Sequence, residues 1–453
     1  MTAQLHLKSA TYRVGDEDFA ADVGDLTVPE DRTPPNSHYS RTITLPVVRL
    51  RSPAAEAAGT VFLLAGGPGY TNIWEKPKTW LLGRHDVVMI GYRGADGSVS
   101  LDLPEVAAAM AAAENPLSVE NRRRIGRAWR AGYERLTREG VAAGAYTMLD
   151  VADDLEDARR ALACGPVDLY ATSYGTRLAY YYGLRYPQSV RRSVMVGVNP
   201  PGRFIWEAGT IDRQLEYYGE LWRRDEAAAS RTPDIVATMR DVLAGLPAEW
   251  GGIRLDRDKV RIWTFAMLSQ RRGAASALNA YAAAARGNMA GLAFLSQAYD
   301  AFVTAGPNFG DMAAKAVGAD FDPDRDYEAE LDPAGSVLGS PLSMLYWATM
   351  KYGGWPFRPL PDEYRAGRPS AVETLLISGT VDFATPGEYA AAEMLPLLPN
   401  GRAVTCAEFG HCSDLSGIQP AAHRHLVETF YADGTADDSL FRYEPMDFSP
   451  EGG

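Results

Sequence analysis

The sequence has few cysteines and no long hydrophobic run. Its 453 residues include only three cysteines, a sparse and odd number that argues against a disulfide framework and suits a reducing cytosol. Free thiols are therefore expected, with a bridge between Cys406 and Cys412 as the alternative. The longest apolar stretches, such as VFLLA at 61–65, are far shorter than the roughly 18 residues needed to cross a bilayer. We expect no membrane-spanning segment.

Clustered positive charge and a secretory leader are also absent. The chain carries 45 Lys and Arg against 58 Asp and Glu, a net charge of −13, and nucleic-acid binding requires clustered basic residues. A signal peptide has a basic start followed by an apolar core. Residues 1–26 contain no such apolar core. We expect a cytoplasmic protein that binds neither nucleic acid nor membranes.

Short apolar runs recur along the chain instead, as expected for strands that are buried on both faces of a parallel sheet. They lie at 59–67, 86–94, 167–173, 192–198, 374–380 and 403–409. Helical segments fall between them at 151–163, 174–186 and 387–398. This alternation predicts a doubly wound α/β sheet with right-handed crossovers, preceded by further strands within the first 50 residues.

The pattern changes between Gly202 and Leu360, where helical spacing replaces the strand-like runs. Ile211, Leu215 and Trp222 share one helical face with Tyr218. Because the chain leaves the sheet and returns to it at 374, we expect an inserted helical domain over one edge of the sheet. The predicted division is an N-terminal part of the α/β core at 1–201, a helical cap at 202–360 and a C-terminal part of the core at 361–453.

Ser173 lies where a predicted strand passes directly into a helix. In Ala171-Thr172-Ser173-Tyr174-Gly175, small residues stand two positions before and after the serine. A nucleophile on such a strained turn needs small neighbours at these positions and is exposed at the end of the sheet. The helix dipole and nearby backbone N–H groups face the same space. We interpret Ser173 as a nucleophile, with a helix N-cap serine as the alternative.

A serine nucleophile needs a base, and His411 is the best placed of the six histidines. It follows the apolar run at 403–409 and one glycine, so it lies on a loop at the carboxyl end of a strand, where reactive groups gather in open parallel sheets. The other histidines lie in the N-terminal segment, before a strand or on a C-terminal helix. We expect His411 to be the general base, with a structural loop histidine as the alternative.

Asp382 fits the third position, a carboxylate that accepts the other imidazole N–H. It follows the strand at 374–380 and precedes His411 by 29 residues, and the chain order Ser, Asp, His is that of α/β-hydrolases. The rivals are weaker, because Asp168 begins a strand at the wrong end of the sheet and Asp414 is expected to be a solvated loop residue.

Acyl transfer also needs two N–H donors where the oxyanion develops. Tyr174, the residue after the nucleophile, should supply one, and the glycine-rich loop at 65–70, directly after a strand, should supply the other. Gly66 and Gly67 let the backbone approach a substrate closely, and a tight glycine turn is the alternative. A phosphate-binding loop is excluded because no Gly-Lys-Ser/Thr ending follows.

Together these motifs resemble the proline iminopeptidase and tripeptidyl aminopeptidase group of α/β-hydrolases. GGPG, Arg93-Gly94, the TSYGT turn, SGTVDFATP and the late Gly-His occur in the order of the group, over about 25–425. The resemblance implies an α/β-hydrolase core with a helical cap. It also implies a serine hydrolase with a covalent acyl-enzyme that cleaves a bond next to an N-terminal residue or short N-terminal peptide.

By position, the resemblance implies Ser173 as nucleophile with Asp382 and His411 as its partners, and the backbone of Gly67 and Tyr174 as the oxyanion hole. Arg93 matches a structural arginine of the group, with a surface salt bridge as the alternative. The chain departs from the group at three places: Ala65 replaces a histidine of some members, Gly91-Tyr92 replace Asp-Gln, and Ala171 replaces a glycine.

In peptidases of this group, cap carboxylates bind the free amine of the substrate. The resemblance therefore makes Glu207, Glu216 and Glu220 candidates for that contact, with Gly66 as a further substrate contact. A solvated helix face is the alternative for the three acids.

Other functions remain open from the sequence. The same triad and oxyanion hole would serve an esterase, lactonase or amidase that acts on a small-molecule metabolite. A non-catalytic hydrolase-fold binding protein usually lacks Ser, His or Asp, and all three are present here. We expect no cofactor and no metal, because the acidic run at 322–326 lacks the glycine of a calcium loop and His423 and His425 would point apart on a helix. The expected partner is a small peptide or a small acyl substrate.

Overall fold

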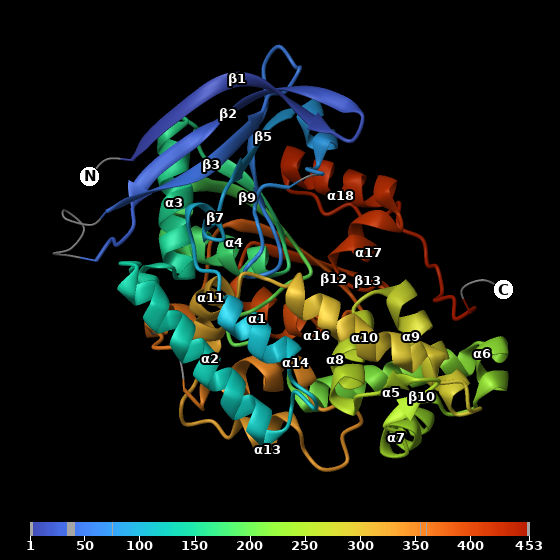
Figure 1. The fold of residues 1–453 in the computed structure, drawn as a ribbon. Helices are drawn as coiled ribbons and strands as arrows, with labels where there is room; N and C mark the ends of the chain where they lie inside the picture. The colour runs from blue at the N-terminus through green and yellow to red at the C-terminus, as the bar shows by residue number, and fades with distance from the viewer. Residues whose placement is uncertain (1–2, 34–40, 75, 354, 359, 451–453) are drawn as a thin grey trace.

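A large sheet forms the centre of the molecule (Figure 1). The structure is a computed structural model that describes residues 3–33, 41–74, 76–353, 355–358 and 360–450. Within these residues nine strands lie side by side in the order β1 (Gln4–Val14), β2 (Glu17–Pro29), β3 (Thr42–Leu50), β5 (His85–Ile90), β4 (Gly59–Leu64), β8 (Val167–Thr172), β9 (Val190–Val196), β12 (Glu373–Gly379) and β13 (Gly401–Cys406). The short strands β6 (Arg93–Gly94) and β7 (Asp96–Ser100) form a separate pair.

The sheet is antiparallel at its N-terminal end and parallel elsewhere. β1, β2, β3 and β5 pair antiparallel in that order. All pairs from β5 to β13 are parallel. The predicted α/β fold with a mostly parallel central sheet is thus confirmed. All six residues of β5 are buried, because helices cover both faces of the sheet.

Helices on the two faces of the sheet enclose two apolar cores. α3 (Met148–Ala161) and α4 (Tyr174–Arg185) cover one face, and α18 (Pro420–Asp433) covers the other (Figure 1). Successive side chains of β4 alternate between the cores: Phe62 and Leu64 belong to the first, and Val61 and Leu63 to the second. The period of two follows from strand geometry. Because the strands from β5 to β13 run parallel, their carboxyl ends lie along one edge of the sheet.

Residues 202–360, which we call the insert, leave this sheet after β9 and are largely helical. Their helices are α5 (Ala208–Arg224), α6 (Glu226–Arg231), α7 (Ile235–Ala244), α8 (Arg257–Met267), α9 (Arg271–Ala284), α10 (Ala290–Thr304), α11 (Phe309–Met312), α12 (Gly318–Asp320), α13 (Tyr327–Leu331) and α14 (Pro341–Ser343), with a hairpin of β10 (Glu249–Trp250) and β11 (Ile253–Arg254). As predicted, α5 buries Leu215, Tyr218 and Trp222 on one face. The insert lies at the carboxyl edge of the sheet (Figure 1).

Two helices that precede the insert in the sequence contact it. α1 (Pro104–Ala111) and α2 (Val119–Arg138), which precede residue 201, pack against the insert. Trp129 of α2 is fully buried and donates from its indole N–H to Thr349 Oγ1 over 3.2 Å. α1 and α2 therefore lie in the same helical layer as the insert.

The remaining helical segments are short. They are α15 (Asp362–Arg365), α16 (Gly387–Tyr389), α17 (Cys412–Gly417), the 3-10 turns η2 (Thr79–Gly83), η3 (Ala143–Ala145), η4 (Pro187–Ser189) and η8 (Leu395–Leu397), and the π turns η5 (Ala313–Val317), η6 (Met344–Ala348) and η7 (Ala390–Met394). In the described chain, no helix has both the length and the apolar character to cross a membrane.

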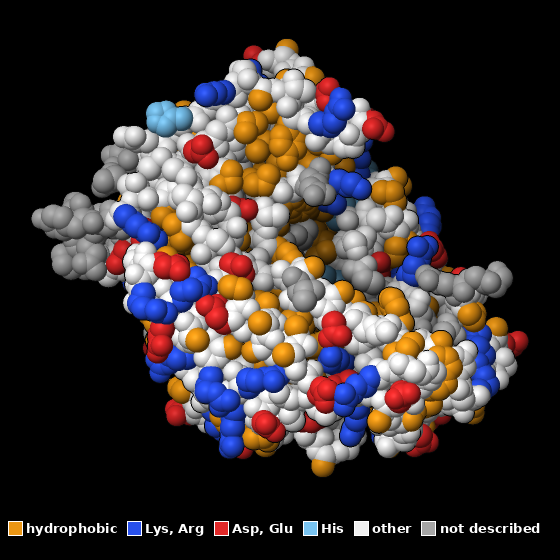
Figure 2. Space-filling view, in the orientation of Figure 1, with side chains coloured by type: hydrophobic (Ala, Val, Ile, Leu, Met, Phe, Trp, Pro, Cys, Tyr) orange, Lys and Arg blue, Asp and Glu red, His pale blue; other side chains and the backbone are white. Residues whose placement is uncertain are grey.

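Charged side chains cover much of the helical part of the face in Figure 2, and hydrophobic side chains gather around a hollow near its middle. Cys164, Cys406 and Cys412 are free thiols, so Cys406 and Cys412 are not bridged.

Candidate active site

Ser173 occupies a strained turn between β8 and α4. Its backbone has φ = +50° and ψ = −120°, a conformation that a non-glycine residue adopts at a cost of about 1–3 kcal/mol. The packing explains why small neighbours are needed, since a Cβ at Gly175 would lie 2.3 Å from the carbonyl oxygen of Leu64. Ser173 stands at the N-cap position of α4, but its side chain makes no capping hydrogen bond. The half-buried Ser173 hydroxyl therefore fits a nucleophile better than a helix cap.

His411 and Asp382 form a short hydrogen bond. His411 Nδ1 lies 2.8 Å from Asp382 Oδ2. The Asp382 side chain is fully buried, and its oxygens accept hydrogen bonds from the backbone N–H of Ala384 and Thr385 and from Thr385 Oγ1 at 2.7–2.8 Å. These donors fix the carboxylate, which in turn holds the proton of His411 on Nδ1. In the neutral imidazole, Nε2 then carries the lone pair that a base needs, with Cys412 Sγ 3.5 Å away.

The pKa of His411 follows from this pairing. Burial alone disfavours the imidazolium, but the Asp382 carboxylate and the neighbouring Cys412 outweigh burial. The pKa of His411 is therefore raised well above its usual value of 6.5. The neutral form that can accept a proton then forms only at correspondingly higher pH.

Ser173 and His411 meet at the end of β9. The carbonyl oxygen of Val196 accepts hydrogen bonds from the Ser173 N–H at 2.9 Å and from Cys412 Sγ at 3.3 Å. Gly197 follows with φ = +66°, and a Cβ there would lie 3.0 Å from His411 Cε1. Between the described residues Ser173 and His411 there is no direct hydrogen bond, and Cys412 Sγ lies 3.5 Å from His411 Nε2. The three predicted residues thus gather at adjacent strand ends.

The predicted oxyanion donors lie beside Ser173. Gly67 has φ = +79° in the loop after β4, and Tyr174 begins α4. Within the described part of the chain, neither backbone N–H has a hydrogen-bond acceptor, so both can bind a developing oxyanion. The N–H of the neighbouring Gly66 donates to Thr172 Oγ1 over 3.0 Å. A Cβ at Gly66 would lie 2.8 Å from Ser173 Cβ, so glycine lets this loop pass close to the serine.

The insert holds this glycine-rich loop from the other side. Asn308 donates from its backbone N–H to Gly69 O over 2.9 Å, and Gly69 donates its N–H to Asp311 Oδ2 over 3.1 Å. Lys315 Nζ lies 2.5 Å from Asp311 Oδ1, and both side chains are at most 1% exposed. Burial raises the pKa of Asp311, although Lys315 opposes this shift. No motif in the sequence identified these residues.

Arg93 orders the loops behind the site. Its guanidinium is fully buried and pairs with both oxygens of Asp154 at 2.6 and 2.7 Å. It also donates to the carbonyl oxygens of Glu30 and Ala145 over 2.7 Å each. Arg93 is therefore a buried structural arginine and not part of a surface salt bridge.

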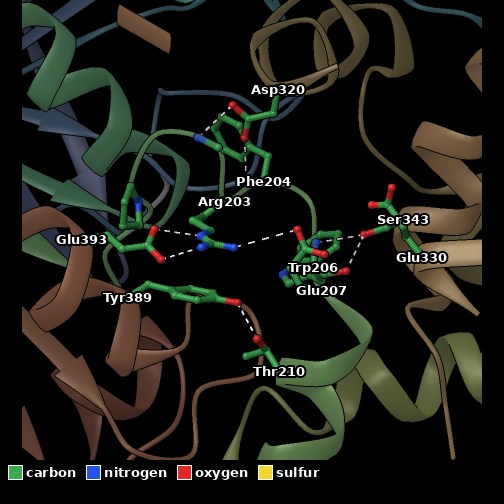
Figure 3. A network of polar contacts seen from close by, with 12 residues as sticks. Arg203, Phe204, Trp206, Glu207, Thr210, Asp320, Glu330, Ser343, Tyr389 and Glu393 are labelled. Carbon is green, nitrogen blue, oxygen red and sulfur yellow. Dashed lines mark hydrogen bonds and ion pairs between the residues drawn. The ribbon is translucent and has the colours of Figure 1, made fainter. Parts of the chain in front are cut away.

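The three candidate carboxylates for amine binding lie in different environments. Glu207 belongs to the network in Figure 3, where Arg203 reaches it over 3.9 Å. In addition, Arg325 Nη2 lies 3.0 Å from each oxygen of Glu207. Glu216 and Glu220 are exposed on α5, away from the buried face of that helix. This exposure is that of a solvated helix face, the alternative given for these acids, and amine binding by the two residues stays a prediction.

The same network attaches the start of the insert to the core. Arg203 pairs with Glu393 at 2.5 and 2.8 Å, and Tyr389 OH lies 2.6 Å from Thr210 Oγ1 (Figure 3). Trp206 donates from its indole N–H to Ala384 O over 2.8 Å, close to Asp382. These contacts join the insert to the loop that carries the candidate acid.

The sheet order, the strained serine and the His–Asp pair define an α/β-hydrolase. A family model described as alpha/beta hydrolase fold matches residues 59–413, and the chain belongs to this family. A tripeptidyl aminopeptidase from Streptomyces lividans is 28% identical over 265 residues, which cover 52% of this chain and 48% of the relative. A tripeptidyl aminopeptidase from Streptomyces coelicolor is 28% identical over 265 residues, with 52% and 47% covered.

These relatives confirm the resemblance to the aminopeptidase group. The chain spans about half the length of the curated relatives it matches. Among solved structures, a serine hydrolase from the bacterium Cycloclasticus zankles has a TM-score of 0.40 and 10% sequence identity, over 95% of this chain and 100% of that chain.

Proposed function

We propose that the protein is a serine hydrolase with Ser173, His411 and Asp382 as its catalytic triad, and that it acts as an aminopeptidase. The product released is an N-terminal residue, of the proline type, or a short N-terminal peptide. The observation that carries the hydrolase proposal is the 2.8 Å bond between His411 Nδ1 and the buried Asp382, at the same sheet edge as the strained Ser173. The names of the relatives favour aminopeptidase activity.

The reaction follows from the roles of these groups. Ser173 Oγ attacks the carbonyl carbon of the scissile bond while His411 Nε2 takes the hydroxyl proton. The backbone N–H groups of Gly67 and Tyr174 donate to the oxyanion that forms. The tetrahedral intermediate then expels the amine, which takes the proton from Nε2. Water repeats the sequence on the acyl-enzyme, releases the acyl product and restores the serine.

Recognition of a free amine needs a carboxylate near the acyl side. Glu207 is the candidate that we retain, since it is only 28% exposed and lies where the insert joins the core. The proposed partner is a small peptide or small acyl molecule, the proposed compartment is the cytoplasm, and neither nucleic acid nor membranes take part. No cofactor or metal enters the reaction as proposed.

A second candidate function is an esterase, lactonase or amidase that acts on a small-molecule metabolite. The observation in its favour is that Arg325 already pairs with both oxygens of Glu207 at 3.0 Å. A carboxylate neutralised in this way attracts an ammonium weakly, whereas an uncharged acyl substrate needs no such contact.

A matched substrate panel separates the two functions. The panel contains prolyl, alanyl and tripeptidyl nitroanilides with a free amine, their N-acetylated forms and a p-nitrophenyl ester. It is applied to the wild type, to Ser173→Ala and to Ser413→Ala, which removes an exposed hydroxyl beside His411. We expect turnover of the free-amine substrates that falls on N-acetylation, is lost in Ser173→Ala and persists in Ser413→Ala. Turnover of the ester alone would overturn the aminopeptidase proposal and establish the second candidate.

A further inference from the structure

Tyr218 of the insert lies between two carbonyl groups close to the candidate triad. The residue is fully buried in α5, and its hydroxyl lies 3.0 Å from both Leu268 O and Val381 O. Its ring packs on Phe383 with the ring centroids 5.6 Å apart. None of the sequence motifs includes this tyrosine, which the helical spacing marked only as a core residue.

Each of the two carbonyl groups belongs to a segment that bears on the His–Asp pair. Val381 directly precedes Asp382. Leu268 directly precedes Ser269, whose carbonyl oxygen accepts the backbone N–H of His411 over 2.7 Å. The Tyr218 hydroxyl thus connects the backbone that carries Asp382 with the backbone that fixes His411.

The chemistry of the phenol suits a permanent contact of this kind. A hydroxyl has one proton, so the two carbonyl oxygens share a single donor. Burial, together with the nearby Asp414 and Asp382, raises the pKa of Tyr218 well above 10, although Arg271 opposes the shift. The donor therefore keeps its proton at every working pH. Without it, two buried carbonyl oxygens lose their side-chain donor.

The same loops have further contacts with the insert. Arg271 donates its backbone N–H to Asp414 Oδ2 over 2.8 Å, and Gly410 donates its N–H to the same oxygen over 3.1 Å. Trp206 donates to Ala384 O on the far side of Asp382. The Asp414 carboxylate thus ties Arg271 of the insert to Gly410 beside His411, and Trp206 holds the backbone beside Asp382. This is the arrangement of a fixed support and not of a lid.

We propose that Tyr218 is a positioning residue of the hydrolase, whose hydroxyl sets the separation of the Asp382 and His411 segments and so the geometry of the His411–Asp382 bond. This inference deepens the proposed function and rests on it. It assigns to the insert a role in positioning the triad in addition to any role in substrate binding. Tyr218 itself touches neither the imidazole nor the carboxylate.

The test compares Tyr218→Phe with Tyr281→Phe. Tyr281 is also fully buried in the insert, and its hydroxyl lies 2.9 Å from Thr264 Oγ1 and makes no hydrogen bond to the triad loops among the described residues. For the best substrate of the panel, kcat, KM and the pH profile of kcat/KM are measured. We expect Tyr218→Phe to lower kcat about tenfold with KM changed less than twofold. Tyr281→Phe should change neither.

The pH profile separates positioning from general destabilisation. Asp382 is the group that raises the pKa of His411 most, with Cys412 next, so a looser His–Asp bond moves the rising limb of kcat/KM to lower pH. We expect this shift in Tyr218→Phe and not in Tyr281→Phe. An unchanged kcat with an unshifted limb in Tyr218→Phe overturns the inference.

Two further variants keep the outcome decisive. Trp206→Phe removes the donor to Ala384 O and should shift the rising limb of kcat/KM in the same direction by a smaller amount. It replaces Tyr218→Phe in the test if that variant does not fold.

Ser173→Ala tests the proposed function separately. If it keeps full activity, the serine hydrolase proposal itself fails. If it is inactive while Tyr218→Phe and Trp206→Phe behave as wild type, only the positioning role fails.

Discussion

Replacing Asp311 by asparagine removes one partner of a buried ion pair below the oxyanion loop. Lys315 Nζ and Asp311 Oδ1 are 2.5 Å apart and almost fully shielded from solvent. Asparagine keeps an oxygen that can accept the Gly69 N–H, but it leaves the ammonium without a carboxylate partner, with the Arg93 carbonyl oxygen 2.8 Å away and the Tyr92 ring centroid 5.4 Å away. The substitution therefore isolates the loss of charge from the loss of shape.

The expected cost can be worked out from this geometry. Removal of one partner from a buried ion pair costs about 3–5 kcal/mol of stability. Because Lys315 keeps the Arg93 carbonyl oxygen as an acceptor, we expect Asp311→Asn to cost about 3 kcal/mol, at the low end of this range. At about 2.1 cal/mol/K per residue, the unfolding entropy of 453 residues is about 1 kcal/mol/K. The melting temperature should fall by about 3 °C. In the double variant Asp311→Asn, Lys315→Met no charge is left unpaired, and we expect recovery to within about 1 kcal/mol of the wild type.

The assay is a double-mutant cycle from urea unfolding of Asp311→Asn, Lys315→Met and the double variant, with kcat measured in parallel. Because the pair supports Gly69, each single variant should also lower kcat more than it changes KM. Additive stability losses, with a double variant that is less stable than either single variant, would refute the reasoning. Losses in stability without any change in kcat would refute the link to the oxyanion loop.

Three further predictions concern the serine turn and the His–Asp pair. Asp382→Asn should lower kcat by about 10³–10⁴ with little change in folding, because Nδ1 of His411 loses the acceptor that fixes its tautomer. In the wild type, kcat/KM should rise with pH along a limb whose midpoint lies above pH 6.5, since the raised pKa of His411 keeps the imidazole protonated at lower pH. A midpoint at or below pH 6.5 would contradict this. Gly175→Ala should reduce the yield of folded protein, because its Cβ meets the carbonyl oxygen of Leu64 at 2.3 Å; a variant with wild-type melting temperature and labelling of Ser173 would contradict that packing argument.

The part of the site that could be predicted is the part with local sequence signals. Ser173 directly follows β8, Asp382 and His411 lie in the loops after β12 and β13, and these strands were visible as short apolar runs. Gly67 lies in a glycine-rich loop with the same kind of signal. Chain order and strand ends were then enough to bring these residues to one edge of the sheet.

The contacts that support these residues had no such signal. Asp311 binds Gly69 across 242 positions of the sequence, and Tyr218 reaches Val381 across 163, so no local pattern links them. Periodicity marked Tyr218 only as buried, and it did not show which neighbours its hydroxyl meets. Glu216 and Glu220 fall outside the apolar face that the helical spacing marked on α5, in agreement with their exposure.

The most direct test of the central claim is the labelling of the protein with a fluorophosphonate, followed by peptide mass spectrometry. Such probes react with a serine that an adjacent base activates. With Ser173 as nucleophile and His411 as base, we expect a single adduct on Ser173 in the wild type, no adduct in Ser173→Ala and strongly slowed labelling in His411→Ala. An unlabelled wild type, or an adduct on any other serine, would contradict the assignment of Ser173 and His411 as nucleophile and base.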